Sequence, residues 1–231
     1  MEMDPPPKML ASLTITILIM IMATSVALAS SDAAVLEGQA RALLDWKASL
    51  DNQSQRALHS WGNTSTPCNW RGITCGTGMH RHRLVIKGIC LRGMRIRGAL
   101  ESLNFSALKT LTCLNLSHNH LTRTIPPSIE VLEELNVLLL QGNQIRGSIP
   151  LCLANLTKIH SLMIQENKVS GEIPRHICNM TSLVTLNLSY NHLDGNIPSE
   201  IGHLTHLVTL DLSSNNLSGS IPSNIGGLTK L

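Results

Sequence analysis

The chain has 231 residues and a formal net charge of +3, which by itself says little about its partners. Only 2% of the residues are aromatic, whereas a single large globular core usually relies on more aromatic side chains. No Cys/His spacing matches a zinc site, and no nucleophile, base and oxyanion donor can be assigned to one another. The sequence therefore predicts no metal, no cofactor and no catalytic site in this chain.

The N-terminal segment has the features of a secretory signal peptide. A polar start that contains Lys8 precedes an apolar run over 10–29, and Ala27 and Ala29 are small residues that suit signal peptidase. We expect cleavage near Ala29 and predict residues 1–29 as the signal peptide. An uncleaved signal anchor is the alternative, because the run is long enough to cross a bilayer. Secretion also argues against nucleic acid as a partner.

The cysteines and glycosylation sequons agree with the secretory pathway, where disulfides form. The predicted glycosylation sites are Asn52, Asn63, Asn104, Asn115, Asn155, Asn179, Asn187 and Asn216. Asn115 and Asn187 lie inside predicted strands, where a glycan would cover the face of a sheet. Cys152 and Cys178 lie in adjacent repeats, so that a bridge between them stays open, whereas Cys90 and Cys113 have no evident partner.

Residues 30–100 form the next predicted unit, which lacks a regular repeat. Apolar residues from Leu36 to Leu50 follow a helical period. A loop rich in Gly, Pro and Ser follows, with Trp61, Trp70 and the pair Cys68 and Cys75, which we interpret as a disulfide. Because the end of a repeat array exposes apolar surface, we expect this helix, the tryptophans and the crosslink to form its cap.

Basic residues without any acidic one occur between Asn52 and Leu100. They are Arg56, Arg71, Arg81, Arg83, Lys87, Arg92, Arg95 and Arg97. Such a patch attracts acidic wall polysaccharide, an acidic or sulfated peptide, or an anionic partner surface. The alternative is a charged face that is only solvated.

A phrase ending in Ile-Pro recurs at an interval of 24 residues in the remainder of the chain. The copies are NHLTRTIP from Asn119, NQIRGSIP from Asn143, NKVSGEIP from Asn167, NHLDGNIP from Asn191 and NNLSGSIP from Asn215. Apolar residues keep the same interval, and in the last copy they are Leu204, Leu207, Leu210 and Leu212. This period and spacing indicate an α/β leucine-rich repeat solenoid over 101–231, with about five repeats and short parallel strands on its concave face.

Each recurring position of this repeat has a physical role. The Asn amides can satisfy backbone groups of the turns, so stacked copies predict a buried ladder. Gly147 and its equivalents permit backbone angles that other residues resist, and Arg123 takes this place in the first copy, so we expect an altered turn there. The prolines disfavour a long helix on the convex side.

The outward positions of the predicted strands define the candidate binding surface. The candidate ligand-binding residues are Leu139, Gln141, Met163, Gln165, Glu166, Tyr190 and Asp211. They combine an apolar centre with hydrogen-bonding groups, and Tyr190 is a potential anchor for a peptide. The alternative is that these positions are simply solvated.

The motifs resemble those of one plant family. EGQARALLDWKASL, SWGN and PCNWRGITC resemble the N-terminal cap of plant leucine-rich repeat receptor-like kinases, and the N-L-x-G-x-I-P repeat is similar to their plant-specific repeat class. SLNFSALKTLTCLNLSHN resembles the start of the array in the male-discoverer-interacting receptor-like kinases. The resemblance implies an extracellular domain, in the apoplast or on the outer face of the plasma membrane, that binds a peptide or protein ligand, with a co-receptor ectodomain as a further expected partner.

The sequence departs from that family after the repeats. The motifs of a kinase domain are absent, so we predict that this chain is not itself a kinase, although a full-length receptor would carry serine/threonine kinase activity. The array stops at Leu231, where Leu228 and Leu231 are expected on an open edge. The chain is thus either a receptor fragment, whose missing part would hold it in the membrane, or a short secreted protein. The second alternative would be a decoy, a co-receptor-like module or a cell-wall enzyme inhibitor.

Overall fold

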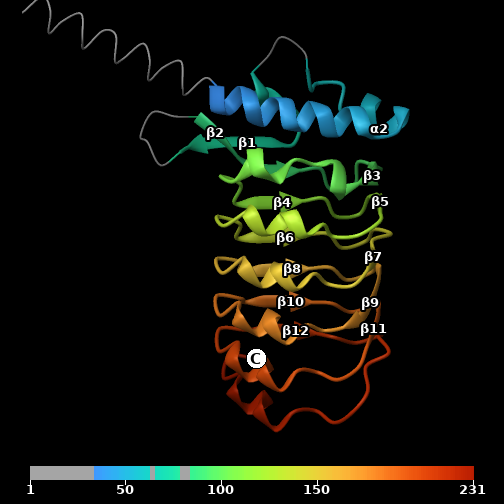
Figure 1. Ribbon diagram of the computed structural model, residues 1–231, viewed down its shortest axis with the longest axis vertical. Coiled ribbons are helices and arrows are strands. Elements are labelled where there is room, and N and C mark those ends of the chain that lie inside the picture. Colours follow the sequence, from blue (N-terminus) through green and yellow to red (C-terminus); the bar gives the residue numbers. More distant parts are fainter. Residues whose placement is uncertain (1–33, 63–65, 79–83) are drawn as a thin grey trace, which may run out of the picture.

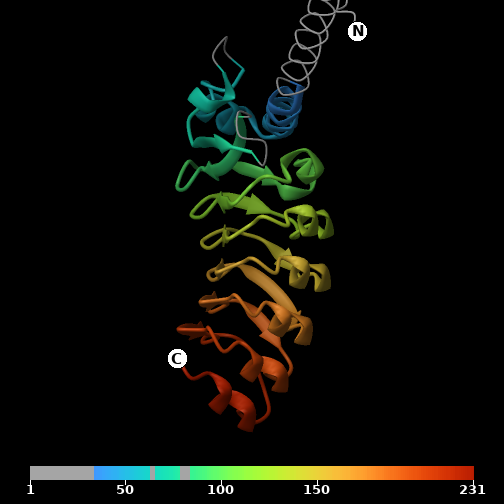
Figure 2. The same ribbon diagram turned by 90° about the vertical axis from the view of Figure 1, so that its left-hand side faces the viewer.

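The computed structural model describes residues 34–62, 66–78 and 84–231. The predicted signal peptide, the sequon at Asn63, and Arg81 and Arg83 lie outside these ranges. The described residues form one elongated, curved stack of layers, with a helical cap at one end and the last repeat at the other (Figures 1 and 2). The predicted leucine-rich repeat solenoid is thereby confirmed.

One long sheet runs through the stack. Its strands, in spatial order, are β1 (Ile73–Thr77), β2 (Leu84–Cys90), β4 (Cys113–Asn115), β6 (Val137–Leu139), β8 (Ser161–Met163), β10 (Thr185–Asn187) and β12 (Thr209–Asp211). β1 is antiparallel to β2, and every later pair is parallel. Leu114, Leu138, Leu162 and Leu186 point inward and are fully buried, while the residues on either side of each are partly exposed. This alternation is what the short leucine spacing predicts.

A second set of strands follows each turn, along another side of the stack (Figure 1). It comprises β3 (Arg97–Ala99), β5 (His120–Thr122), β7 (Arg146–Gly147), β9 (Lys168–Glu172) and β11 (His192–Asp194). β3 pairs with β5, and β9 lies between β7 and β11. Sequence analysis missed these strands because segments of two to five residues are too short for a clear alternating pattern.

Short 3₁₀ helices replace long helices on the convex side, as the prolines predicted. They are η3 (Phe105–Leu108), η4 (Pro127–Val131), η5 (Leu151–Asn155), η6 (Arg175–Asn179), η7 (Ser199–His203) and η8 (Ser223–Gly227), with η1 (Pro67–Asn69) and η2 (Leu100–Ser102) nearer the cap. Pro126, Pro150 and Pro174 stand directly before their helices with extended backbone.

The cap covers the first strands with two helices, one described over 34–49 and α2 (Asn52–Ala57). Its centre is a stack of tryptophans: Trp61 lies 6.2 Å from Trp46 and 5.7 Å from Trp70, measured between ring centroids. The predicted disulfide between Cys68 and Cys75 is present. Hydrogen bonds join the cap to the array, since Trp46 Nε1 donates to the carbonyl of Ala99 at 3.0 Å.

The predicted asparagine ladder is also present. Asn143 Nδ2 donates to the carbonyls of Leu116 and Leu140 at 3.0 and 2.9 Å, and its Oδ1 accepts from the backbone N–H of Leu121 at 2.9 Å. Asn143 is only 8% exposed, and the other asparagines of the ladder make equivalent bonds. Each amide thus joins two layers and satisfies backbone groups that a turn would otherwise leave unpaired.

Three expectations are corrected. Arg123 adopts the left-handed conformation of its glycine counterparts, with φ of +65° against +78° at Gly147, so its turn is not altered. The open possibility of a bridge between Cys152 and Cys178 is not realised, because both are free thiols, and burial raises the pKa of Cys178 to about 11. At the last repeat Leu231 is exposed as expected, but Leu228 is only 6% exposed because it packs against the core.

Candidate functional site

The concave sheet places four of the candidate residues side by side. Leu139 of β6 stands opposite Met163 of β8, and both are partly exposed. Gln141 and Gln165 follow in the same two layers, which the hydrogen bond from Gly142 N–H to the Gln165 carbonyl joins at 3.0 Å. Two apolar side chains therefore border two primary amides in the middle of the sheet.

The two glutamine amides have unused acceptors. Oε1 of Gln141 and Oε1 of Gln165 are each buried and accept no hydrogen bond within the described structure. A buried acceptor without a hydrogen-bond partner destabilises the folded state by about 1–3 kcal/mol.

Strands β4, β10 and β12, on either side of this centre, end in a different hydrogen-bonding arrangement. Asn115, Asn187 and Asp211 each accept hydrogen bonds from the backbone N–H and the hydroxyl of the serine two residues later, with 2.7 Å between the side-chain oxygens. The Ser213 hydroxyl is the main reason that the pKa of Asp211 lies below its ordinary value, with burial acting in the opposite direction. Ser117 and Ser189, which occupy the same repeat position as Gln141 and Gln165, are almost fully buried. Asp211 is thus held in a local motif at the lower end of the sheet.

Glu166 and Tyr190 lie at the rim, where the strands enter their turns. Both have positive φ, +57° and +51°, and the N–H of Asn167 donates to the carbonyl of Tyr190 at 3.2 Å, so their layers are adjacent. Tyr190 is 61% exposed and presents its ring to solvent. The candidate set is therefore divided into a centre of four residues, a rim of two, and Asp211 below.

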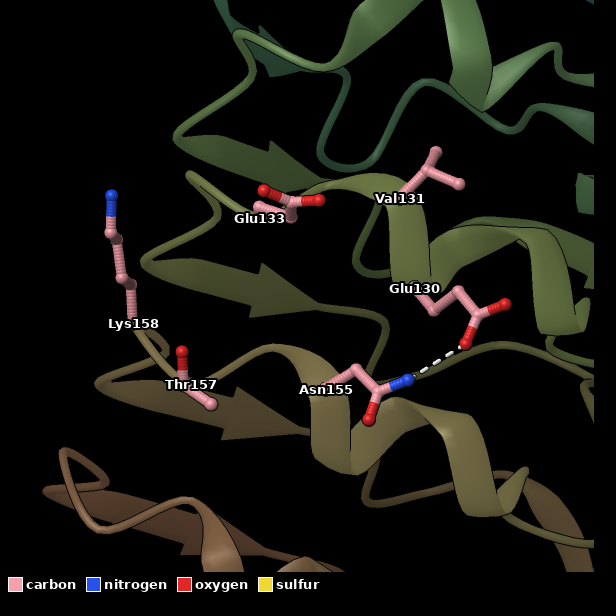
Figure 3. A pocket seen from close by; sticks show the side chains of 6 residues that line it. All are labelled: Glu130, Val131, Glu133, Asn155, Thr157 and Lys158. Atoms are coloured by element: carbon pink, nitrogen blue, oxygen red, sulfur yellow. Dashed lines mark hydrogen bonds between the residues drawn. The ribbon is translucent and has the colours of Figure 1, made fainter.

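One hollow lies away from this surface, on the convex side. It has a volume of about 540 Å³ and is lined by Glu130, Val131, Glu133, Asn155, Thr157 and Lys158 (Figure 3). Asn155 Nδ2, the atom that would carry a glycan in this sequon, donates to Glu130 Oε2 at 2.8 Å. The hollow is lined mainly by polar side chains and contains none of the candidate ligand-binding residues.

The described sequons differ in accessibility. Asn52, Asn104, Asn155, Asn179 and Asn216 are exposed, whereas Asn115 and Asn187 are half-buried on the concave sheet with their Oδ1 atoms engaged by serines. Glycosylation of all these positions stays a prediction.

Residues 34–62, 66–78 and 84–231 hold no cluster of three or more His, Cys, Asp or Glu side chains placed to bind a metal ion. No helix within the same ranges combines the length and the apolar character needed to cross a membrane.

Family models match the cap and the repeats. The leucine-rich repeat N-terminal domain matches residues 36–76, the leucine-rich repeat matches 110–132 and 134–156, and the two-copy leucine-rich repeat model matches 181–229. The receptor-like serine/threonine-protein kinase RGI3 of Arabidopsis thaliana is 41% identical over 95 residues, covering 41% of this chain and 8% of the relative. MDIS1-interacting receptor like kinase 2 of the same plant is 39% identical over 93 residues, covering 38% and 8%. The chain thus spans less than a tenth of the length of these relatives.

Solved ectodomains share the fold over most of the chain. The GASSHO1/SCHENGEN3 ectodomain from Arabidopsis thaliana, in complex with CASPARIAN STRIP INTEGRITY FACTOR 2, has a TM-score of 0.74 at 30% identity, covering 84% of this chain and 23% of that one. The receptor kinase HAESA, in complex with the peptide hormone IDA and the co-receptor SERK1, has a TM-score of 0.66 at 30% identity, covering 84% and 36%.

The BIR2 ectodomain from Arabidopsis thaliana is matched over almost its whole length. Its TM-score is 0.67 at 30% identity, and the match covers 78% of this chain and 94% of BIR2. Cap, repeat class and fold agree in all these comparisons. The chain therefore belongs to the plant leucine-rich repeat receptor-like kinases and corresponds to the ectodomain of that family.

Proposed function

We propose that the concave sheet binds an extended peptide or protein ligand outside the cell, so that the domain acts in signal perception by recognition rather than catalysis. The observation that carries the proposal is the central group of Leu139, Met163, Gln141 and Gln165. An apolar contact surface beside amides with unused acceptors suits a peptide, which offers apolar side chains and backbone N–H donors at regular spacing.

Similar proteins support this reading. HAESA, which shares the fold over most of this chain, is seen with a peptide hormone and a co-receptor, and BIR3 is seen in complex with SERK2. By analogy, a co-receptor ectodomain is a second partner for this chain. The exposed Tyr190 at the rim is the residue we expect to contact either the ligand or that partner.

Localisation and domain division belong to the same proposal. The ectodomain would face the apoplast, either on the outer face of the plasma membrane or as a secreted form. Residues 1–29 would be its signal peptide, 30–100 its cap and 101–231 its repeats. The kinase activity of relatives would then require residues other than the matched cap and repeats.

Selection of peptides on the purified ectodomain tests the proposal. A library of random synthetic peptides would be selected on the wild-type protein, and the enriched peptides measured on the Leu139→Gln/Met163→Gln variant. Both substitutions keep side-chain size and remove apolar contact, so we expect the affinity to fall about tenfold or more, since each buried apolar side chain contributes ~1.5–3 kcal/mol. Calorimetry would give the dissociation constants.

The matched control is Leu151→Gln/Val208→Gln, which changes two exposed aliphatic residues outside the central group. Leu151 is 63% exposed and Val208 is 52% exposed. Affinity should be unchanged in this control. If no peptide is enriched, or if the enriched peptides bind the two variants equally well, the concave centre is not the binding site.

A further inference from the structure

The outer face of the second set of strands carries a row of basic side chains. Ile96, Leu121, Ile145 and Val169 point inward and are buried, so the residues on either side of each point outward. Five of these outward or adjoining residues are basic, and all five are exposed: Arg95, Arg97, Arg123, Arg146 and Lys168. We call this set the basic stripe. Its strands β3, β5, β7 and β9 lie one after another along one long side of the stack (Figure 1).

Strand pairing brings these residues together, although they are far apart in sequence. Arg97 stands opposite His120 between β3 and β5, and Arg146 stands opposite Lys168 between β7 and β9. The N–H of Arg146 donates to the carbonyl of Arg123 at 2.7 Å, which places Arg123 in the adjoining layer. The stripe therefore extends from the cap through three repeats, over the pair β3 and β5 and the pair β7 and β9, which the hydrogen bond between Arg146 and Arg123 joins.

The positive charge of the stripe is only partly balanced within the described structure, where Asp51 lies near Arg97 and Glu101 lies near Arg123. The side-chain ion pairs among the described residues are Glu37–Arg41 and Glu134–Lys158, neither of which includes a stripe residue. Glu101 lies near Arg123, but its carboxylate accepts from the N–H and the hydroxyl of Thr124, both at 2.9 Å. Like charges directly opposite on neighbouring strands destabilise a sheet. The facing pair Arg146 and Lys168 therefore favours an external anion.

Three observations indicate what kind of ligand the basic stripe binds. A hollow of about 380 Å³, lined by Arg97, Gly98, His120, Thr122 and Gln144, adds hydrogen-bonding groups to the charge. The exposed large apolar side chains of the described structure are Leu84, Leu151, Tyr190, Val208, Ile221 and Leu231, and none belongs to the stripe. A protein partner would require an apolar contact centre, which is missing here.

The third observation is spacing. Successive layers follow one another at ~4.8 Å, so the cations of neighbouring layers lie a short interval apart along the stack. The row ends where β9 and β11 bring Glu172 opposite Asp194, an acidic pair. The sequons at Asn104, Asn115, Asn155, Asn179 and Asn187 lie on the concave or the 3₁₀ side, away from the stripe. Asn52 follows Asp51, whose N–H donates to the Arg97 carbonyl at 3.4 Å, so a predicted glycan borders the stripe only at its cap end.

We propose that the basic stripe binds a linear acidic polysaccharide, with sugar carboxylates on the arginines and Lys168 and sugar hydroxyls on Thr122, Gln144 and His120. A polymer with a carboxylate on every sugar matches a row of cations that lacks apolar contacts. The surface is separate from the concave sheet, so this inference does not depend on the proposed function. The sequence led us to expect a polysaccharide site at the cap, whereas this proposal places it mainly on the repeats. Of the basic residues named for the cap, only Arg95 and Arg97 belong to the stripe.

Calorimetric binding of an α-1,4-linked oligogalacturonate tests the inference, with an oligomer long enough to span four layers at ~4.8 Å. The variant is Arg146→Gln/Lys168→Gln. The control with the same change of charge is Lys109→Gln/Arg175→Gln, since both residues are exposed and lie on the 3₁₀ side. A fully methyl-esterified oligomer of the same length provides the uncharged ligand.

We expect the wild type to bind the acidic oligomer and not its ester. The stripe variant should bind it at least tenfold more weakly, because each cation near an anionic surface contributes about fivefold in affinity, while the control should change less than twofold. Thermal unfolding would show that both variants are folded.

Three results would overturn the inference. Absence of binding to the acidic oligomer excludes the polysaccharide, and equal loss in both variants shows a diffuse charge effect instead of a site. Binding to phosphatidylserine vesicles without binding to the oligomer would assign the stripe to a membrane surface.

Discussion

Several non-glycine residues in the turns have positive φ, a conformation that a side chain disfavours. His118, Glu166, Tyr190 and Ser214 have positive φ at the place where the second repeat has Gly142. Arg123 does so where the later repeats have glycine. The tertiary stack enforces these conformations, because neighbouring turns share hydrogen bonds such as that from Arg146 N–H to the Arg123 carbonyl. A non-glycine residue in this region costs of order 1 kcal/mol.

The first prediction follows from this strain. We expect Arg123→Gly to raise the free energy of unfolding by ~0.5–1 kcal/mol, because the turn keeps its conformation and loses the side-chain clash. Urea unfolding, followed by circular dichroism, would measure the change. Arg146→Gly removes the same charge at a residue without positive φ and should destabilise the protein instead. Destabilisation by Arg123→Gly would show that its side chain contributes more than the strain.

At the scale of single elements, the cap depends on local capping and the repeats on shared hydrogen bonds. Helix α2 begins after Asp51, whose side chain accepts from the N–H of Ser54 at 2.8 Å. The side chain and backbone of Ser54, together with Arg97 and Arg56, hold the pKa of Asp51 below its ordinary value of 3.8. Ser54 is buried, and its hydroxyl accepts from the N–H of Arg97 at 2.7 Å, so this short helix connects the cap to β3.

The second prediction concerns the pH dependence of this cap. Asp51→Ala should reduce the free energy of unfolding by about 1 kcal/mol at pH 7, as is typical for loss of an N-cap. Because the folded pKa is lowered, the contribution of the carboxylate is present above the unfolded value of about 3.9 and is lost as pH falls through the folded value. Urea unfolding from pH 7 to pH 2 would therefore show wild type and variant converging below pH 4.

Asp51→Asn is the control, because it keeps a capping oxygen and removes the charge. It should retain most of the stability at pH 7 and show a weaker dependence on pH. A difference between wild type and Asp51→Ala that stays constant down to pH 2 would contradict the charge-based account.

At the scale of the whole molecule, each layer contacts only its neighbours, as Figures 1 and 2 show. Stability in such a stack is approximately a sum of the contributions of layers and interfaces. The ladder asparagines and the leucines at the same depth repeat these interfaces along the axis, while the tryptophans stabilise one end. Damage at one end should therefore remain local.

The third prediction tests this locality with Trp61→Ala. Trp61 is 1% exposed between Trp46 and Trp70, so its removal should destabilise the cap by ~3–5 kcal/mol. Hydrogen exchange followed by mass spectrometry should speed up in residues 84–122 and stay unchanged in residues 185–211. Tyr190→Ala removes an exposed aromatic residue and should alter neither region. Equal acceleration in both regions would show that the array unfolds as one unit.

The sequence predicted the features that depend on short, regular spacing along the chain. The solenoid, the asparagine ladder and the inward leucines followed from the repeat, because a fixed interval places equivalent residues in equivalent environments. The pair Cys68 and Cys75 was found because both lie in one short loop. Of the candidate site, the neighbouring positions of Leu139 and Met163 could also be predicted, since the same interval sets the strand register.

Other features required the tertiary structure. Ser117 and Ser189 are buried and hydrogen-bond to Asn115 and Asn187, whereas Ser213 makes the same bonds to Asp211 and is exposed, so their burial depends on the neighbouring layers. The unused acceptors of Gln141 and Gln165 and the left-handed conformation of Arg123 depend on what adjoining layers provide.

The sequence by itself determined the repeat architecture, the cap and the family, because these are recorded in residue types at regular short intervals. Only the tertiary structure decided which polar groups remain available and which charges meet. Arg97, Arg123, Arg146 and Lys168 become one surface only through the strand pairs β3–β5 and β7–β9 and the hydrogen bond that joins Arg146 to Arg123. Strands of a few residues have too little pattern to reveal that pairing, and their register is imposed by the stacking of the layers on either side.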